Sequence, residues 1–243
     1  YAFVRIPDEY VDNPEKNTDP KEKIRAWQNE WNTTYHTGIG AEPLLEATRE
    51  VFMTYSIPFE LSIKFTDAML QDLVKARYQT YNELKEYMHG SAEVVGLMLT
   101  YIFGYNDSSA FIYAAKLGEA MQLTNFLRDI REDYDERGRI YLPQEDMNLH
   151  GVTEATLRTR TVSPEFINLM NYEIQRARTL FKEADIGILM LSPKTQFAVR
   201  LASRLYEKIL DKIEDQKYDV FTNRARSNLL NKLIIITKTY VKY

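Results

Sequence analysis

The sequence predicts an all-α protein, a single-domain helical bundle. Apolar residues recur at three- and four-residue spacing over long stretches, and no stretch shows the sustained alternation of a strand. No low-complexity linker divides the 243 residues, and no internal repeat is evident. A chain of this length can bury an ample core. We therefore expect residues 1–243 to form one domain.

The helical periodicity covers four main segments, roughly 60–104, 110–134, 164–190 and 194–216. Breaks rich in Gly, Pro, Asn and Ser are expected at 13–20, 38–40, 56–58, 104–107, 163–164 and 192–193. Asp107 or Ser108 is expected to cap the helix that carries the second of two acid pairs. Residues 1–5 already look helical and lack an initiator Met, so we expect an upstream segment to be missing.

Charge and composition limit what the chain can bind. The net charge of −4 and the interleaved charges leave no basic stripe, so nucleic acid is not an expected partner. The absence of cysteine excludes a disulfide framework and thiolate metal sites, and without a visible signal peptide it favours a reducing cytoplasm. The apolar stretch 229–236 is too short to span a bilayer; it predicts a final core helix or, alternatively, a membrane-touching one.

Two aspartate pairs are the most informative feature of the chain. Asp8 and Asp12, and again Asp129 and Asp133, are four residues apart in segments that read as helix, so each pair shares one face. Asn125 lies one turn before Asp129, so Asn125, Asp129 and Asp133 form one polar stripe along the helix. Aligned carboxylates repel each other unless a cation lies between them, and Mg²⁺ prefers oxygen ligands and bridges to diphosphate. We expect these residues to bind Mg²⁺, with Mn²⁺ as the alternative ion.

A single pair of this kind is more often a solvated helix face. Here the neighbouring residues leave little of the second helix free for solvent, because most are apolar: Leu117, Ala120, Met121, Thr124, Leu127 and Ile130. Acidic residues embedded in an apolar helix usually have a functional role. The three histidines are scattered without ligand spacing, so no zinc site is expected.

Several blocks together resemble the squalene/phytoene synthase family. Residues 1–12 and 122–133 are similar to its two aspartate-rich motifs, and Arg-Gly-Arg-Ile-Tyr-Leu-Pro at 137–143 follows the second motif as in the family. The helices at 77–98 and the segment 201–221, which ends in Tyr-Asp-Val-Phe, also agree. The residues of these motifs are most similar to those of phytoene synthases.

The resemblance implies an isoprenoid synthase fold and the head-to-head joining of two prenyl diphosphates. In the family, Mg²⁺-assisted loss of one diphosphate leads to a cyclopropyl intermediate, and a second ionisation opens this ring. Phytoene-type enzymes then lose a proton from two geranylgeranyl units, whereas squalene synthases take a hydride from NADPH onto two farnesyl units. We expect phytoene from geranylgeranyl diphosphate without NADPH, with squalene or dehydrosqualene from farnesyl diphosphate as the alternative. Peripheral contact with a membrane would suit release of such a product.

The resemblance also assigns roles to side chains outside the acid pairs. Arg5 belongs to the diphosphate clamp, with an ion pair to Asp8 or Glu9 as the structural alternative. Gln122 becomes a pocket residue. Tyr87 is placed among the catalytic residues and Tyr206 near the diphosphates, although either of these tyrosines could instead serve core packing.

One departure from the family concerns the second phosphate-binding arginine. Relatives often carry paired arginines where this chain has Asn223-Arg224, so Arg224 is expected to fill that role and Arg226 is the alternative. The substrate tunnel is expected between the helices of the two acid motifs, and its depth depends on which residues project inward, with Phe52, Tyr55, Leu97 and Tyr101 among the candidates. Two other classes stay open: a terpene cyclase or chain-elongating prenyltransferase, and a catalytically silent helical scaffold of a prenyl pathway.

Overall fold

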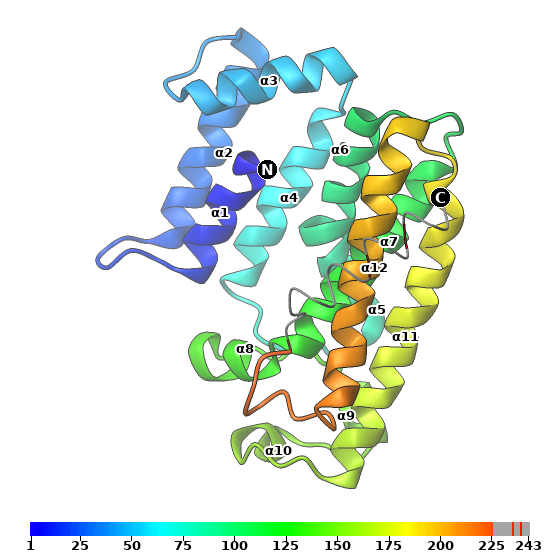
Figure 1. The fold of residues 1–243 in the computed structure, drawn as a ribbon. Helices are drawn as coiled ribbons and strands as arrows, with labels where there is room; N and C mark the ends of the chain where they lie inside the picture. Colours follow the sequence, from blue (N-terminus) through cyan, green and yellow to red (C-terminus); the bar gives the residue numbers. More distant parts are fainter. Residues whose placement is uncertain (226–234, 236–238, 240–243) are drawn as a thin grey trace.

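A computed structural model describes residues 1–225 together with residues 235 and 239, and it confirms the all-α prediction (Figure 1). The helices are α1 (Ala2–Asp12), α2 (Pro20–Thr37), α3 (Pro43–Tyr55), α4 (Phe59–Asp72), α5 (Tyr81–Met88), the π-helix η1 (His89–Glu93), α6 (Val94–Phe103), α7 (Ala110–Arg128), α8 (Ile130–Arg137), α9 (Gln144–Leu149), α10 (Glu154–Arg158), α11 (Pro164–Ile188) and α12 (Pro193–Asp215). Apart from Ile235, the apolar stretch 229–236 lies outside the described residues. No helix among the described residues could cross a membrane.

The predicted breaks all coincide with helix ends. Asp19 caps α2 by accepting a hydrogen bond from Lys21 N at 2.9 Å, and Gly38, with a φ of 79°, ends it. The prediction that Asp107 or Ser108 caps α7 is wrong. Ser109 holds the cap position, while Asp107 Oδ1 accepts from Ser109 N at 2.8 Å and so stabilises the preceding turn.

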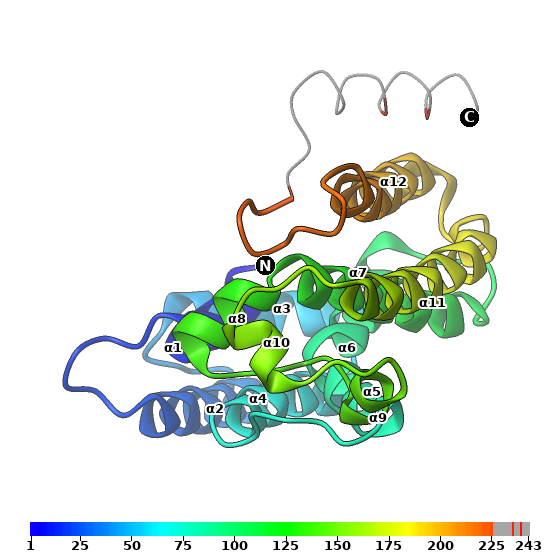
Figure 2. The same ribbon diagram turned by 90° about the horizontal axis from the view of Figure 1, so that it is seen from below.

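Helix α7 is the centre of the bundle. It packs against α6 and η1 on one side and against α11 and α12 on the other, and α1 to α4 form the remaining side (Figures 1 and 2). The main apolar core runs through these central helices. A second core gathers around Trp31, which is fully buried, donates from Nε1 to Ser62 Oγ at 2.7 Å and has its ring centroid 5.1 Å from that of Phe52.

The apolar pattern over 60–104 corresponds to several helices rather than one. Residues 73–80 interrupt it, and they pair with the chain that follows α8: Ile140 N donates to Ala76 O and Gln144 N to Tyr78 O, both at 2.9 Å. These bonds satisfy backbone groups that a continuous helix would have paired within itself. They bring the Arg-Gly-Arg block beside the end of α4.

A buried ion cluster in α11 leads to a prediction about pH. Glu173 is fully buried, Arg176 Nη1 lies 2.6 Å from its Oε2 and 2.9 Å from Asp146 Oδ2, and burial raises the pKa of Glu173 to about 8 from its ordinary value of 4.5. Because the unfolded chain releases this proton at lower pH, this group's contribution to stability falls as the pH rises from 4.5 to 8. The expected fall is about 3–5 kcal/mol.

Glu173→Gln should remove this part of the pH dependence, since the amide does not titrate. We expect urea unfolding between pH 5 and 8.5 to show a shallower loss of stability in the variant than in the unchanged protein. Comparison of the two proteins cancels the contributions of other carboxyls. Parallel stability curves would contradict the prediction.

Candidate active site

The two acid motifs face each other across one polar pocket of about 280 Å³. The pocket brings together all the predicted site residues except Tyr206, namely Arg5, Asp8, Asp12, Tyr87, Gln122, Asn125, Asp129, Asp133 and Arg224. Helix α1 supplies the first pair, and its buried residues Phe3, Pro7 and Val11 anchor the helix at a spacing of four. This anchoring leaves Asp8 and Asp12 on the pocket side.

The second motif spans a kink. The prediction of one helix over 110–134 is wrong, because α7 ends at Arg128 and α8 begins at Ile130. Between them Asp129 has a φ of −104° and a ψ of 14°. The stripe nevertheless survives: Asp129 N donates to Asn125 O and Asp133 N to Asp129 O, both at 2.9 Å. Residues four apart therefore still lie on the same face across the kink.

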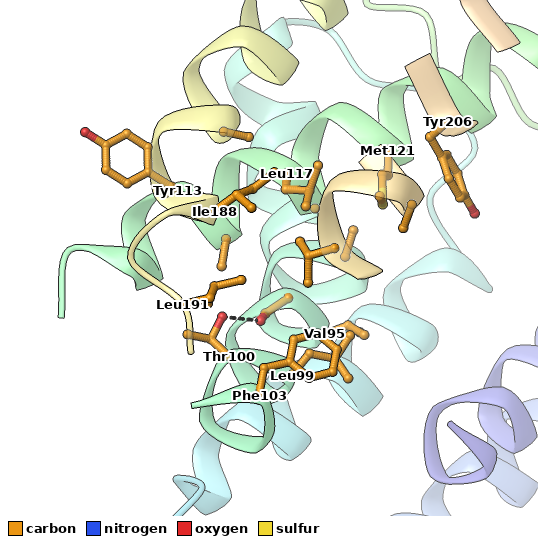
Figure 3. Close-up of a pocket in the computed structure, with 18 of the residues that line it drawn as sticks. Val95, Leu99, Thr100, Phe103, Tyr113, Leu117, Met121, Ile188, Leu191 and Tyr206 are labelled. Carbon is orange, nitrogen blue, oxygen red and sulfur yellow. Dashed lines mark hydrogen bonds between the residues drawn. The ribbon is translucent and has the colours of Figure 1, made fainter. Parts of the chain in front are cut away.

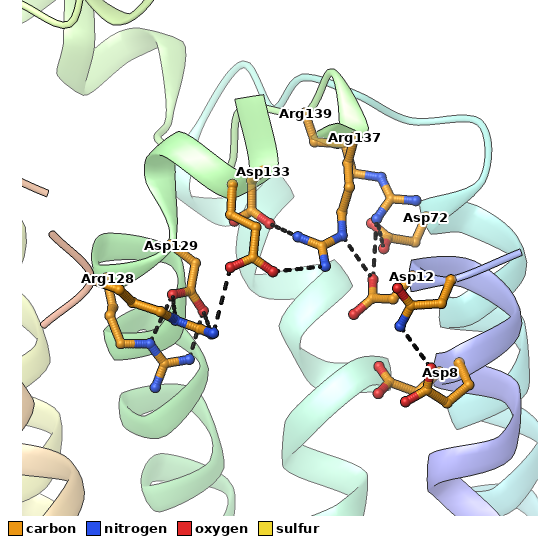
Figure 4. Close-up of polar contacts among 12 residues, drawn as sticks. Asp8, Asp12, Asp72, Arg128, Asp129, Asp133, Arg137 and Arg139 are labelled. Carbon is orange, nitrogen blue, oxygen red and sulfur yellow. Dashed lines mark hydrogen bonds and ion pairs between the residues drawn. The ribbon is translucent and has the colours of Figure 1, made fainter. Parts of the chain in front are cut away.

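Arginines neutralise most of these carboxylates (Figure 4). The Asp129 carboxylate accepts bidentate hydrogen bonds from two guanidinium groups, from Arg128 at 2.8 and 2.6 Å and from Arg224 at 2.7 and 2.8 Å. Burial alone would raise the pKa of Asp129, but the hydrogen bonds from the two guanidinium groups hold it below its ordinary value. Arg5 pairs with Asp8 at 2.5 Å and also with Glu9, as the structural alternative for Arg5 predicted.

Arg137 connects the two motifs. Its Nε lies 3.2 Å from Asp12 Oδ1, and its Nη1 lies 3.1 Å from Asp133 Oδ1. Even so, burial and, to a smaller extent, the nearby carboxylates of Asp129 and Asp12 together raise the pKa of Asp133 to about 8. Burial and Asp12 likewise raise the pKa of Asp8. Burial thus disfavours the charged forms of Asp133 and Asp8 despite the arginines paired with them.

The donor set fits Mg²⁺, although the described residues form no preformed metal cage. No group of three His, Cys, Asp or Glu side chains within the described part of the chain is arranged to hold a metal by itself. The pocket does offer carboxylate oxygens from both motifs. Asn125 Oδ1 is buried and has no hydrogen-bond partner among the described residues. Hard oxygen donors of this kind suit Mg²⁺, which usually takes its remaining ligands from water and substrate phosphates.

An apolar cavity of about 420 Å³ adjoins the polar pocket (Figure 3). It runs along α7 from Asn125 to Ala110, about 22 Å at the rise of a helix. Its other walls come from α6, α11 and α12. Ser91, Gln122 and Asn125 line both spaces and so form the neck between them. Tyr206 lies in the wall of the cavity and not in the polar pocket.

Two expectations about the tunnel are corrected. The polar pocket lies between the two acid motifs, but the apolar cavity lies among α6, α7, α11 and α12, and α1 does not line it. None of Phe52, Tyr55, Leu97 and Tyr101 lines the cavity. Phe52 belongs to the Trp31 core, and Tyr101 packs on Phe111 with ring centroids 4.6 Å apart. The end far from the neck is lined instead by Phe103, Ala110 and Leu191.

Sequence reasoning missed two acids that line the polar pocket, Asp72 and Glu132, and of these only Asp72 lies outside the acid motifs. Asp72, at the end of α4, lines the polar pocket, and its Oδ1 accepts from the hydroxyl of Tyr141 at 2.7 Å. Its Oδ2 lies 2.8 Å from Arg139 Nη1. Arg139 and Tyr141 stand in the recognised Arg-Gly-Arg block, but Asp72 has no acidic neighbour at helical spacing. No signal in the sequence distinguishes it.

The fold and the pocket define a class of helical proteins with paired acid motifs at the mouth of an apolar cavity, and comparisons with known proteins identify the family. Residues 1–231 match the squalene/phytoene synthase family, and the chain belongs to it. Phytoene synthase of Daucus carota is 35% identical over 99% of this chain and 61% of its own length. Phytoene synthase of Arthrospira platensis is 35% identical over 93% of this chain and 76% of its own length. The chain therefore spans about three fifths of the carrot relative.

Solved structures agree with this family. A dehydrosqualene synthase in complex with a ligand superposes with a TM-score of 0.91 at 26% identity, covering 100% of this chain and 84% of its own. A squalene synthase from Alicyclobacillus acidocaldarius gives a TM-score of 0.83 at 28% identity, with 90% of this chain and 81% of its own covered. The chain is thus similar in sequence to phytoene synthases and in fold to enzymes named as dehydrosqualene and squalene synthases.

Proposed function

We propose that this protein joins two geranylgeranyl diphosphates head to head, through a cyclopropyl diphosphate, to give phytoene. The observation that carries the proposal is the junction of a charged pocket with an apolar cavity at one neck. A prenyl diphosphate has the same division into charged head and apolar tail. The family and the phytoene synthases among the relatives supply the reaction type.

The side chains divide the work of ionisation. Four arginines line the polar pocket and can turn from their carboxylate partners to diphosphate oxygens: Arg5, Arg128, Arg137 and Arg224. Asp8, Asp12, Asn125, Asp129 and Asp133 would hold Mg²⁺, or alternatively Mn²⁺. When bound, the metal neutralises charge on the departing diphosphate. The apolar walls exclude water from the carbocation, which favours loss of a proton over capture by water.

We take NADPH to be unnecessary for the reaction, because loss of a proton completes phytoene without a hydride. The second candidate is the formation of dehydrosqualene from farnesyl diphosphate, because a dehydrosqualene synthase superposes closely on this chain. The cytoplasmic location stays a prediction, as does peripheral contact with a membrane.

Incubation with Mg²⁺ and either farnesyl or geranylgeranyl diphosphate, each with and without NADPH, tests the proposal when the products are identified by mass. Phytoene from geranylgeranyl diphosphate alone is the expected result. Dehydrosqualene as the main product would overturn the proposed chain length, and squalene formed only with NADPH would overturn the proposed last step. A cyclic or merely elongated product would point to the other synthase classes. No turnover of either substrate would favour the silent scaffold.

Ala202→Phe should shift substrate choice toward the shorter chain. Ala202 lines the cavity from α12, so a phenyl ring there would take up room that the longer tail needs. We expect the ratio of kcat/KM for geranylgeranyl over farnesyl diphosphate to fall about tenfold or more. Ile186→Phe is the matched control, because Ile186 is exposed on α11 and does not line the cavity. An unchanged ratio in a folded Ala202→Phe protein would contradict the position of the tail.

A further inference from the structure

One residue of the neck between the two spaces carries a hydroxyl group with no partner among the described residues. Ser91 lines both the polar pocket and the apolar cavity. Its Oγ is buried and makes no hydrogen bond with any residue that the structure describes. Elsewhere in the bundle, Thr100 donates to Gly96 O at 2.9 Å and Thr124 to Ala120 O at 2.8 Å, each to the carbonyl four residues earlier. A buried hydroxyl without such a bond is costly to keep.

The π-helix explains why Ser91 differs from these threonines. Ser91 lies in the middle of η1, where Val94 N donates to His89 O, five residues earlier, instead of four. Such a turn contains an extra residue and redirects the side chains within it, and π turns of this kind are frequent at functional sites.

Close backbone packing fixes this turn in place. A Cβ on Gly90 would come within 2.7 Å of Ala68 Cβ on α4, and one on Gly118 of α7 would come within 2.8 Å of Ala92 O. The turn is therefore clamped between two helices by positions that only glycine can occupy without displacement of a neighbour. A hydroxyl on such a rigid wall is positioned before substrate arrives.

The neck is also where the reacting bond must lie. With the diphosphate among the arginines of the polar pocket and the prenyl tail in the apolar cavity, the bond from C1 to the bridging oxygen crosses the neck. We propose that Ser91 is a catalytic residue whose hydroxyl donates a hydrogen bond to this bridging oxygen. As the C1–O bond breaks, its electron pair passes to the departing oxygen. The hydrogen bond stabilises that charge without transfer of a proton.

This inference rests on the proposed function, and its test is the release of diphosphate from geranylgeranyl diphosphate with Mg²⁺. Ser91→Ala should lower kcat on the order of a hundredfold with little change in KM, because the bond strengthens only as charge develops. Ser91→Thr, which restores the hydroxyl, should recover most of the loss. Thr48→Val is the matched control. The Thr48 hydroxyl on α3 donates to Leu44 O at 2.7 Å, and Thr48 is far in sequence from the residues that form the neck.

Calorimetry with geranylgeranyl thiolodiphosphate adds a readout that does not depend on turnover. Its bridging sulfur is a weak acceptor, so the unchanged protein and Ser91→Ala should bind it with equal affinity. Unchanged kcat in Ser91→Ala would overturn the assignment, and so would equal losses in Ser91→Ala and Ser91→Thr.

Ser91→Cys, whose side chain is of similar size but a weaker donor, replaces the alanine variant in the test if that variant does not fold. It should also lose turnover. Normal turnover in that variant would overturn the assignment. Release of no diphosphate by the unchanged protein, from either chain length, would instead overturn the proposed function.

Discussion

Asp129→Asn and Asp8→Asn are each expected to lower the rate of diphosphate release about a thousandfold, because each removes a charge that would help hold the metal in the transition state. The two residues lie on opposite walls of one pocket, in α1 and at the junction of α7 and α8. Loss of either should therefore have a similar effect. Circular dichroism should show an unchanged helical content.

Asp135→Asn serves as the control for both variants. Asp135 is also on α8, but it does not line the pocket and pairs with Arg160 at 2.8 Å. It should retain nearly full activity, as expected of a surface ion pair. Turnover of Asp129→Asn or Asp8→Asn close to that of the unchanged protein, at saturating Mg²⁺, would refute the metal assignment.

The helices and the acid stripes could be predicted because both depend on local spacing. Pro and Gly punctuation placed the breaks, as at Asp19, Gly38 and Ser163, where capping contacts are set by neighbours in sequence. The stripe of Asn125, Asp129 and Asp133 even survives a kink that the sequence did not predict, because the hydrogen bonds of the turn persist there.

The cavity could not be predicted in the same way, because space arises where side chains are small and helices diverge. Phe52 and Tyr101, two bulky candidates for the tunnel wall, instead fill apolar clusters elsewhere. Much of the cavity wall consists of small residues such as Ala114, Ala184 and Ala202. Whether an alanine faces a cavity or a close neighbour depends on contacts between distant segments.

The pairing of arginines with acids from distant segments was beyond local reasoning for a similar reason. Arg224 reaches Asp129 across 95 residues of sequence, and Arg139 reaches Asp72 across a turn built by pairing of 76–79 with 140–145. Ser91 shows the same limit, because only the packed structure reveals that this residue lies at the neck and that its hydroxyl lacks a partner within the described part of the chain.

Asp72→Ala should destabilise the protein by about 3–5 kcal/mol, because it leaves Arg139 as a buried charge without its counter-ion. The side chains of Asp72 and Arg139 are only 5% and 9% exposed, and Asp72 also accepts the Tyr141 hydroxyl. Tyr141→Phe loses that one hydrogen bond and should cost only about 1 kcal/mol. Urea unfolding without Mg²⁺ measures both values.

Replacement of both charged partners separates the charge from the packing. If the cost of Asp72→Ala comes from the stranded guanidinium, then Asp72→Leu combined with Arg139→Leu should be more stable than Asp72→Ala, since no unpaired charge is left in the core. Tyr141 would keep its ring stacked on Phe126, with centroids 4.0 Å apart, in either background. A double variant less stable than Asp72→Ala would show that the ion pair contributes mainly through its shape and its hydrogen bonds. A loss below about 1 kcal/mol for Asp72→Ala would show that solvent or another carboxylate, such as Asp12 at 3.8 Å from Arg139, compensates the charge.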